Sequence, residues 1–216
     1  MACDITLGDV TYSCDDLGIG GLKRVIIANK STLVGKVLGN DGTTDISPVV
    51  SVDAAGEVTI VTDTTVAVSG DDNSLYGLLS ATAGPAGGFL ASEVQFNLKD
   101  GFSVFSEVKT VTADGIVNSV PTIAIEIPKM SEEHRNDLDN LAKPGAELVA
   151  FVETAAGTYH LVGWDYGLYA ATVDGTSGTG RSEKNRYQLT LTGEEDSLSY
   201  SIDGANWANL TTSVAP

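Results

Sequence analysis

The chain has 216 residues, of which 29 are acidic and 12 are basic, so its formal charge at pH 7 is −17. This balance argues against a general nucleic-acid surface and against adhesion to anionic membranes, because both need clustered Lys and Arg. A hydrophobic content of 42% and a mean hydropathy of +0.07 are enough to bury a core, and they exclude a chain that is disordered by composition.

Residues 1–22 predict an N-terminal arm that ends in glycines before the first strand. The arm has no basic region followed by an apolar stretch, so no signal peptide is indicated, and no run in the chain approaches the length of a membrane span. We therefore expect synthesis and assembly in the cytoplasm, without membrane contact. Cys3 and Cys14 are the only cysteines, and two thiols without a secretory signal are more often free than paired.

Strand patterns dominate the segment from residue 22 to residue 130. A first strand is predicted in LKRVIIANKSTLVGKVL, followed by short strands in PVVSV, EVTIVT and TVAVSG. The glycine-rich residues 70–92 predict a long loop. The segments SEVQFNLKD and GFSVFSEVKTVTADG then alternate, and the Asp100–Gly101 turn between them predicts a hairpin. The next alternating strand, TIAIEIPKM, is expected to stop at Pro128.

One helix is predicted, over residues 131–142. Ser131 is a suitable N-cap, and two glutamates occupy the first turn, where the helix dipole favours negative charge. An apolar stripe consists of Leu138, Leu141 and Ala142, and a Lys-Pro-Gly sequence ends the pattern. Because only one side of this helix is apolar, we expect it to lie against a sheet.

Four more strand-like segments follow the helix: ELVAFVET, TYHLVGWDYGLYAATV, RYQLTLTGEE and LSYSIDG. The order is therefore β-rich, one helix, β-rich, with no internal repeat and no low-complexity linker. This order predicts an all-β fold, mainly an antiparallel β-sandwich or barrel, with one short flanking α-helix near 131–142. We expect residues 1–216 to form a single domain.

The stretch GTSGTGRS, residues 175–182, has the pattern of a phosphate-binding P-loop with Arg181 in the place of the lysine. A P-loop needs a helix after the glycines, because the helix N-terminus supplies N–H groups to the phosphates. Here Tyr187, Leu189 and Leu191 alternate with polar residues, which is the period of a half-buried strand. We therefore expect Gly175–Asn185 to be a hairpin or inter-subunit loop without nucleotide affinity.

The sequence predicts no catalytic, cofactor or metal site, and we expect no enzyme activity. His134 and His160 occur without a G-x-S-x-G elbow or an H-E-x-x-H motif. The carboxylate clusters at 70–72 and 193–196 lack a calcium-loop pattern and are interpreted as solvated turns. A glycosidase pair stays open as an alternative, because the fold rather than the spacing places its two acids.

Aromatic residues gather between residues 159 and 207, among them Trp164, Tyr166 and Tyr169 in one strand-like segment. They could form a stacking platform for sugars. The interpretation that we favour is that they are core and interface anchors of a β structure, because such rings bury a large area and keep a polar tip.

Over roughly residues 121–200, a polar-capped helix, SEEHRNDLDNLAKPG, is followed by ELVAFVET, TYHLVGWDYGLYAATV, a Gly/Thr-rich loop and RYQLTLTGEE. This order resembles the virion structural proteins of tailed phages, and tail-tube-like proteins in particular. The opening MACDITLGDVTYSCDDLGIGGLKRV is similar to the start of such proteins, whereas residues 40–95 show no such likeness.

The resemblance implies a β-sandwich or barrel subunit with a helix at its flank. Such subunits form rings, usually hexameric, whose inner strands build a continuous channel, and the rings stack through loops and terminal arms. The expected partners are further copies of the chain and other phage tail proteins, in a virion tail assembled in the host cytoplasm. DNA would pass through the lumen without specific binding. An acidic lining would repel the phosphate backbone, and such a lining would give the chain a negative net charge such as the observed −17.

Other functions remain open on the sequence. A head decoration protein or a neck protein belongs to the same structural class. A carbohydrate-binding or adhesin-type β-sandwich module is indicated by the concentration of Trp and Tyr, and an enzyme such as a glycosidase is the third possibility.

Overall fold

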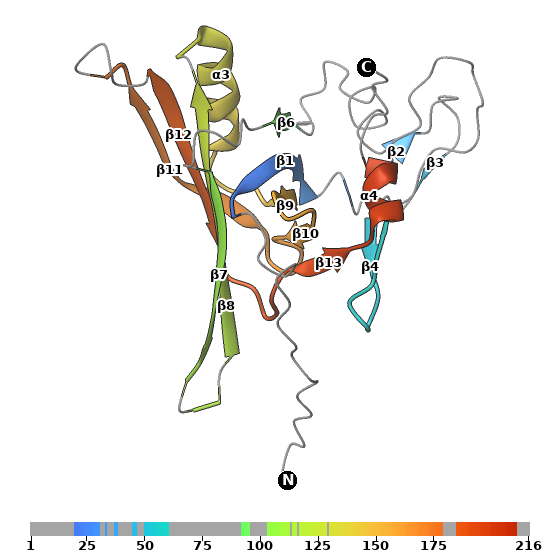
Figure 1. Ribbon diagram of the computed structural model, residues 1–216. Helices are drawn as coiled ribbons and strands as arrows, with labels where there is room; N and C mark the ends of the chain where they lie inside the picture. The colour runs from blue at the N-terminus through green and yellow to red at the C-terminus, as the bar shows by residue number, and fades with distance from the viewer. Residues whose placement is uncertain are drawn as a thin grey trace, which may run out of the picture.

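The computed structural model describes residues 20–30, 33, 37–38, 45–46, 50–60, 92–95, 103–112, 114–115, 117–128, 130–178 and 185–210. Within these residues the fold is mainly antiparallel β-sheet with a short helix at its flank, as the alternating patterns predict (Figure 1). The predicted N-terminal arm, except for its last three residues, and the predicted loop at 70–92, except for Ser92, lie outside the described residues.

The elements form one large sheet and two small ones. The nine-stranded sheet consists of β1 (Leu22–Asn29), β6 (Ser92–Gln95), β7 (Val104–Val111), β8 (Val117–Pro128), β9 (Leu148–Thr154), β10 (Tyr159–Val162), β11 (Leu168–Thr176), β12 (Arg186–Gly193) and β13 (Tyr200–Ile202). The two-stranded sheets pair β2 (Val37–Leu38) with β3 (Asp45–Ile46), and β4 (Val50–Val52) with β5 (Val58–Ile60). The helices are α3 (Glu132–Leu141) and α4 (Gly204–Leu210).

The nine-stranded sheet is bent into two layers. The five-stranded layer has the order β6-β1-β9-β10-β13, and the four-stranded layer has the order β11-β12-β8-β7. A single pair, Leu168 opposite Leu148, joins β11 to β9 and makes the layers continuous. Figure 1 shows the four-stranded layer as a long upright sheet, with β1, β9 and β10 crossing beside it.

Glycines allow the chain to turn the corner between β10 and β11. Gly163 and Gly167 have φ angles of +82° and +90°, a region that side chains with a Cβ rarely adopt. At Gly193, where β12 ends beside this corner, an added Cβ would lie 2.6 Å from the carbonyl oxygen of Gly167. The corner therefore requires residues without side chains at the point where the layers meet.

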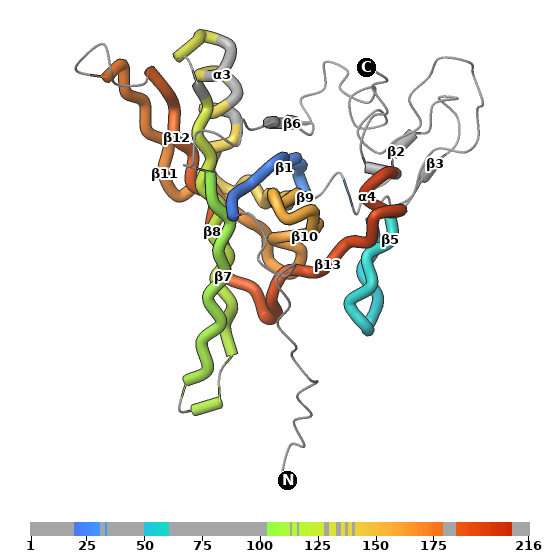
Figure 2. The backbone as a smooth tube through the Cα atoms, in the orientation of Figure 1, coloured from blue at the N-terminus to red at the C-terminus, as the bar shows by residue number. Residues whose placement is uncertain are grey.

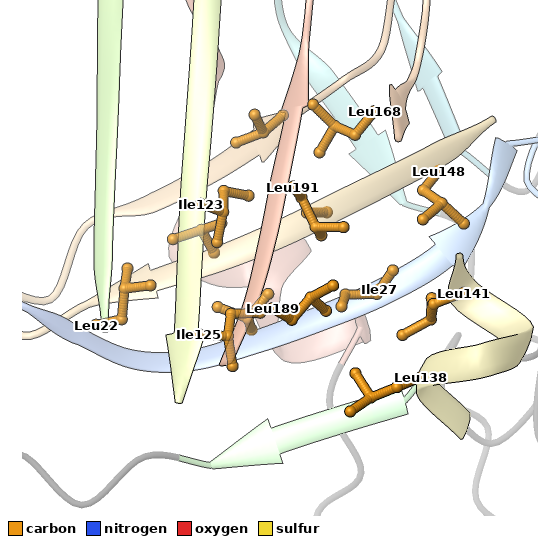
Figure 3. Packing of buried hydrophobic residues seen from close by; sticks show 14 residues of the cluster. Leu22, Ile27, Ile123, Ile125, Leu138, Leu141, Leu148, Leu168, Leu189 and Leu191 are labelled. Atoms are coloured by element: carbon orange, nitrogen blue, oxygen red, sulfur yellow. The ribbon is translucent and has the colours of Figure 1, made fainter. Parts of the chain in front are cut away.

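Two hydrophobic clusters lie on the two sides of the five-stranded layer, and for this reason β9 is buried on both faces. The first fills the space between the layers and under α3 (Figure 3), with Leu22, Val25, Ile27, Ile123, Ile125, Leu138, Leu141, Leu148, Ala150, Val152, Val162, Leu168, Leu189 and Leu191. The second lies under β4, β5 and α4, where the rings of Tyr159 and Trp207 stack with centroids 4.6 Å apart.

The helix prediction is confirmed with small changes. α3 begins at Glu132, and the carbonyl oxygen of Ser131 accepts a hydrogen bond from the N–H of Arg135 at 3.1 Å. Leu138 and Leu141 are buried against the four-stranded layer and β1 (Figure 3), whereas Ala142 is exposed. Pro128 is the last residue of β8, as expected.

The sequence pattern does not predict the second helix, α4. Asp203 caps it, since its side-chain oxygen accepts the N–H of Asn206 at 2.6 Å. The Asp203–Gly204 pair had the signature of a turn, and an N-cap uses the same kind of residue for the same reason. The local pattern could therefore not separate the two outcomes.

Two other expectations about strands are wrong. Of the predicted hairpin around Asp100–Gly101, the turn lies outside the described residues, and the described strands do not pair with each other, because β6 pairs with β1 and β7 pairs with β8. An Asp-Gly turn favours a local reversal, but β6 finds a distant partner along the edge of β1. The strand-like segment around Trp164 is interrupted by the loop between β10 and β11, and the first predicted strand ends at Asn29.

Candidate assembly surface

The face of the four-stranded layer that points away from the hydrophobic core, called the outer face here, carries hydroxyl groups. The pairing register places Tyr169, Thr192, Thr122 and Ser106 in one row across the four strands, and Thr172, Thr190, Ala124 and Val104 in the next. Side chains at alternate positions of these strands share the face, because successive residues of a strand point to opposite sides. All of these residues are half-buried or exposed.

Few charges lie on the outer face. Arg186 donates to the carboxylate of Glu126 at 2.6 Å, and this pair lies on the face together with Asp174. Among the described residues of the four strands, Arg186 is the only cation on this face, and it has a carboxylate partner. The described part of the face therefore carries one carboxylate beyond the ion pair.

Both edges of the four-stranded layer lack a partner strand within the described residues. At one edge, β7 pairs only with β8, and at the other, β11 pairs with β12 and touches β9 only at Leu168. Three antiparallel pairings separate β7 from β11, so the two edge strands run in opposite directions. Open edges present unpaired N–H and C=O groups that can add a further strand.

The two ends of the layer project in opposite directions. Figures 1 and 2 show the β7–β8 hairpin extending below the body and the β11–β12 hairpin extending above it. The pairing continues to the last residues of each hairpin, with Val111 opposite Val117 and Thr176 opposite Arg186. The second hairpin confirms that the glycines after residue 175 connect strand to strand. The absence of nucleotide affinity stays a prediction.

A buried carboxylate fixes the corner loop between β10 and β11. Glu195 is 5% exposed, and its carboxylate accepts the N–H groups of Asp165 at 2.7 Å, Tyr166 at 3.1 Å and Gly167 at 3.2 Å. Its backbone also exchanges two hydrogen bonds with Ser119 of β8, both 2.8 Å long. Burial raises the pKa of Glu195 above its ordinary value of 4.5, although the three N–H bonds oppose that change.

A second polar group joins β7 to the segment before β13. Glu107 accepts the N–H of Ser199 at 2.7 Å and its hydroxyl at 2.9 Å, and the same hydroxyl lies 3.3 Å from Nδ1 of His160. Burial lowers the pKa of His160 below 6.5, while the charge of Glu107 acts in the opposite direction. Ser199 stands between the acid and the imidazole, whereas a catalytic triad needs the imidazole in the middle.

The carboxylates Glu107 and Glu195 line one shallow pocket together with Trp164 and Tyr200. This is the kind of arrangement that the glycosidase alternative requires. The pocket leaves no space for a water-sized molecule, and both carboxylates are occupied by hydrogen bonds within the protein. The geometry of these two acids therefore does not fit a sugar-cleaving pair in this pocket.

The other residues singled out in the sequence lie in separate parts of the fold. His134 lies in α3, and the cluster at 70–72 lies outside the described residues. The cluster at 193–196 was interpreted as a solvated turn, and this is wrong for Glu195. Trp164 packs half-buried against the second hydrophobic cluster, whereas Tyr166 and Tyr169 are 61% and 56% exposed. The aromatic segment is therefore divided between core and surface.

Within the described residues, no group of three or more His, Cys, Asp or Glu side chains could hold a metal ion. No helix in the described part of the chain combines the length and the hydrophobicity that crossing a bilayer requires. Comparisons of the chain with protein-family models, with curated proteins and with solved structures give no match.

Proposed function

We propose that the protein is a structural subunit of a bacteriophage tail that assembles into rings, and that the rings stack into a tube through which DNA passes. The observation that carries this proposal is the four-stranded layer with two open edges of opposite direction. A copy rotated about an axis along the strands brings its β11 beside β7 of the first copy. The new pair is then antiparallel, like every other pair in the layer.

This kind of contact is heterologous, because two different edges meet. Repetition of a heterologous contact gives a closed ring when the rotation closes. The resemblance to tail-tube-like proteins implies that this ring is a hexamer. The layers of successive copies would form a closed barrel, which removes the free edges that a monomer exposes. The described sheet supplies the alternating strand directions that such closure needs.

In this arrangement the outer face lines the bore. Its threonine hydroxyls and methyl groups offer no cation for DNA phosphates, and the guanidinium of Arg186 is held by Glu126. DNA gains affinity mainly from phosphate contacts with Lys and Arg, so such a wall lets DNA pass without holding it. In this arrangement DNA adheres weakly because the wall of the bore has almost no net charge, and an acidic wall is not needed.

A carbohydrate-binding module is the second candidate function. The observation that favours it is the exposure of Tyr166 and Tyr169, at 61% and 56%, since exposed aromatic rings can stack on sugars. Trp164, the largest ring of the segment, packs against the core. A binding platform would therefore consist of the two tyrosines alone.

The test is the assembly state of the purified full-length chain across a salt series. Each copy carries a charge of −17, so copies repel one another, and the Debye length of about 3 Å near 1 M salt relieves this repulsion. We expect association to increase with salt in sedimentation velocity, and rings or rods in negative-stain electron microscopy. Small monodisperse particles at every salt and protein concentration, together with binding to a glycan array, would favour the carbohydrate module.

A further inference from the structure

The start of β11 presents two exposed tyrosines on a backbone that is firmly held. Tyr169 points to the outer face, and Tyr166 lies in the loop that leads into the strand. The three N–H bonds to Glu195 fix this loop, and the hydroxyl of Tyr166 donates to Asp196 at 2.9 Å. Because the backbone of this loop is already ordered, little further conformational entropy is lost from it when a partner packs on the two tyrosines.

The opposite edge of the same layer presents valines. Val104 and Val108 of β7 are 49% and 61% exposed, and both point to the outer face. Soluble monomers usually protect a long edge strand with charges, prolines or bulges. The described edge of β7 pairs regularly with β8 over eight residues and carries the charged side chains Glu107 and Lys109 only on its other face. Among the described residues, the outer side of this edge therefore carries no charge.

The register indicates which residues of the two edges lie at the same level along the strands. Tyr169 lies in the same row as Ser106, through Thr192 and Thr122. If the rows continue from one copy to the next, Tyr169 stands opposite Ser106 of the neighbouring copy. Val104 and Val108 are then its diagonal neighbours, and a diagonal position in a sheet is within reach of an aromatic ring. Aromatic and β-branched side chains form favourable pairs across strands.

We propose that Tyr169 of one copy packs between Val104 and Val108 of a second copy, with Tyr166 extending the contact. This inference rests on the proposed function, for which it names the side chains that join neighbouring copies. Glu195 acts as a positioning residue, because it holds the loop that displays Tyr166. The partner is a second copy of this chain, since both halves of the contact lie on the four-stranded layer. The two edge strands run in opposite directions, and the residues that would meet lie in the same row of that layer.

The test is a disulfide at the row next to Tyr169. Val104 lies in the row of Thr172, so the variant V104C/T172C, made in a background with Cys3 and Cys14 changed to Ser, places two thiols opposite each other. Both positions are exposed, so the variant should fold. We expect mild oxidation to give a ladder of covalent dimers, trimers and larger species. Each single-cysteine variant should give dimers at most, and only slowly.

A second experiment removes the aromatic side chain of Tyr169. Tyr169→Ala should weaken association about tenfold in sedimentation velocity, since one buried aromatic contact is lost. Val173→Ala is the matched control, because Val173 is an exposed residue of the same strand on the other face, and it should leave association unchanged.

The outcomes separate the two proposals. Rings or tubes without a ladder, and with normal association of Tyr169→Ala, would overturn the inference and leave the proposed function standing. A ladder without rings or tubes would support the contact and remove the proposed function. Rapid dimers from V104C alone would indicate a two-fold contact between two β7 edges and would overturn the inference. A chain that never associates contradicts both.

Discussion

The space between the two layers is apolar at one end and polar at the other. At the apolar end, leucines and isoleucines of β8, β12, β1 and α3 fill the space (Figure 3). At the polar end, Glu107, Glu195, Ser199 and His160 form hydrogen bonds between the layers. The change takes place within two residues of one strand, since Phe105 packs against the apolar cluster and Glu107 belongs to the polar group.

The two ends stabilise the molecule in different ways. Apolar burial is strong but has no direction, so it stabilises the pair of layers without fixing one loop conformation. Hydrogen bonds depend on direction and distance, so the polar end fixes the corner loop and its tyrosines. The polar end also has a cost. The hydroxyl of Ser119 is buried and has no hydrogen-bond partner among the described residues.

A substitution at the apolar end should reduce the free energy of unfolding the most. Leu191→Ala removes a side chain that is 0% exposed, and such substitutions cost about 2–5 kcal/mol of unfolding free energy through lost transfer and a cavity. Thr190→Ala is the matched control, because Thr190 is the neighbouring residue on the outer face, and it should cost less than about 1 kcal/mol. Urea denaturation of both variants measures the difference. Equal losses would show that the outer face is as tightly packed as the inner one.

The apolar end could be predicted from the sequence to a large extent. Alternation in RYQLTLTG and TIAIEIP places Leu189, Leu191, Ile123 and Ile125 on one face, and the structure buries all four. The stripe of α3 also points to the core, as its spacing indicates. Periodicity works here because burial depends on which face a residue occupies, and this is a local property of the chain.

The next effect belongs to the polar end. Glu195→Gln should cost about 1–3 kcal/mol, because the amide nitrogen of Gln faces an N–H donor where a carboxylate oxygen now accepts. The neighbouring Glu194 is exposed, so Glu194→Gln is the control and should have little effect. Thermal unfolding measures both variants, and hydrogen exchange at residues 165–167 should increase in the first one alone.

The sign of the pH dependence provides a further check on this carboxylate. The folded-state pKa of Glu195 is raised above 4.5, so its contribution to stability is present below pH 4.5 and is lost as the pH rises through the raised value. Over that interval the wild type should lose stability relative to Glu195→Gln. A constant difference between the two proteins across the interval would contradict the role of burial.

The polar end could not be predicted from the sequence. The cluster GEED has the composition of an exposed turn, and nothing in the sequence marks its second glutamate as buried. The N–H groups that Glu195 accepts are 28–30 residues away along the chain, and Glu107 and Ser199 are separated by 92 residues. Such contacts depend on how the layers pack. The strand partner of β6 was missed for the same reason.

The titration of His160 should change the stability of the protein the least. Burial lowers its pKa in the folded state, while Glu107 opposes this, and Ser199, Thr158 and Phe105 are the uncharged groups beside the ring. The unfolded chain therefore binds the proton more readily, so the stability that the neutral ring contributes is present above pH 6.5 and is lost as the pH falls below it. His160→Asn keeps a donor near the place of Nδ1 but does not titrate, so its stability should depend less on pH than that of the wild type as the pH falls below 6.5. Urea denaturation at several pH values compares the two proteins. If both lose stability in parallel below pH 6.5, another group controls the acid response, and the polar end then contributes geometry without contributing pH dependence.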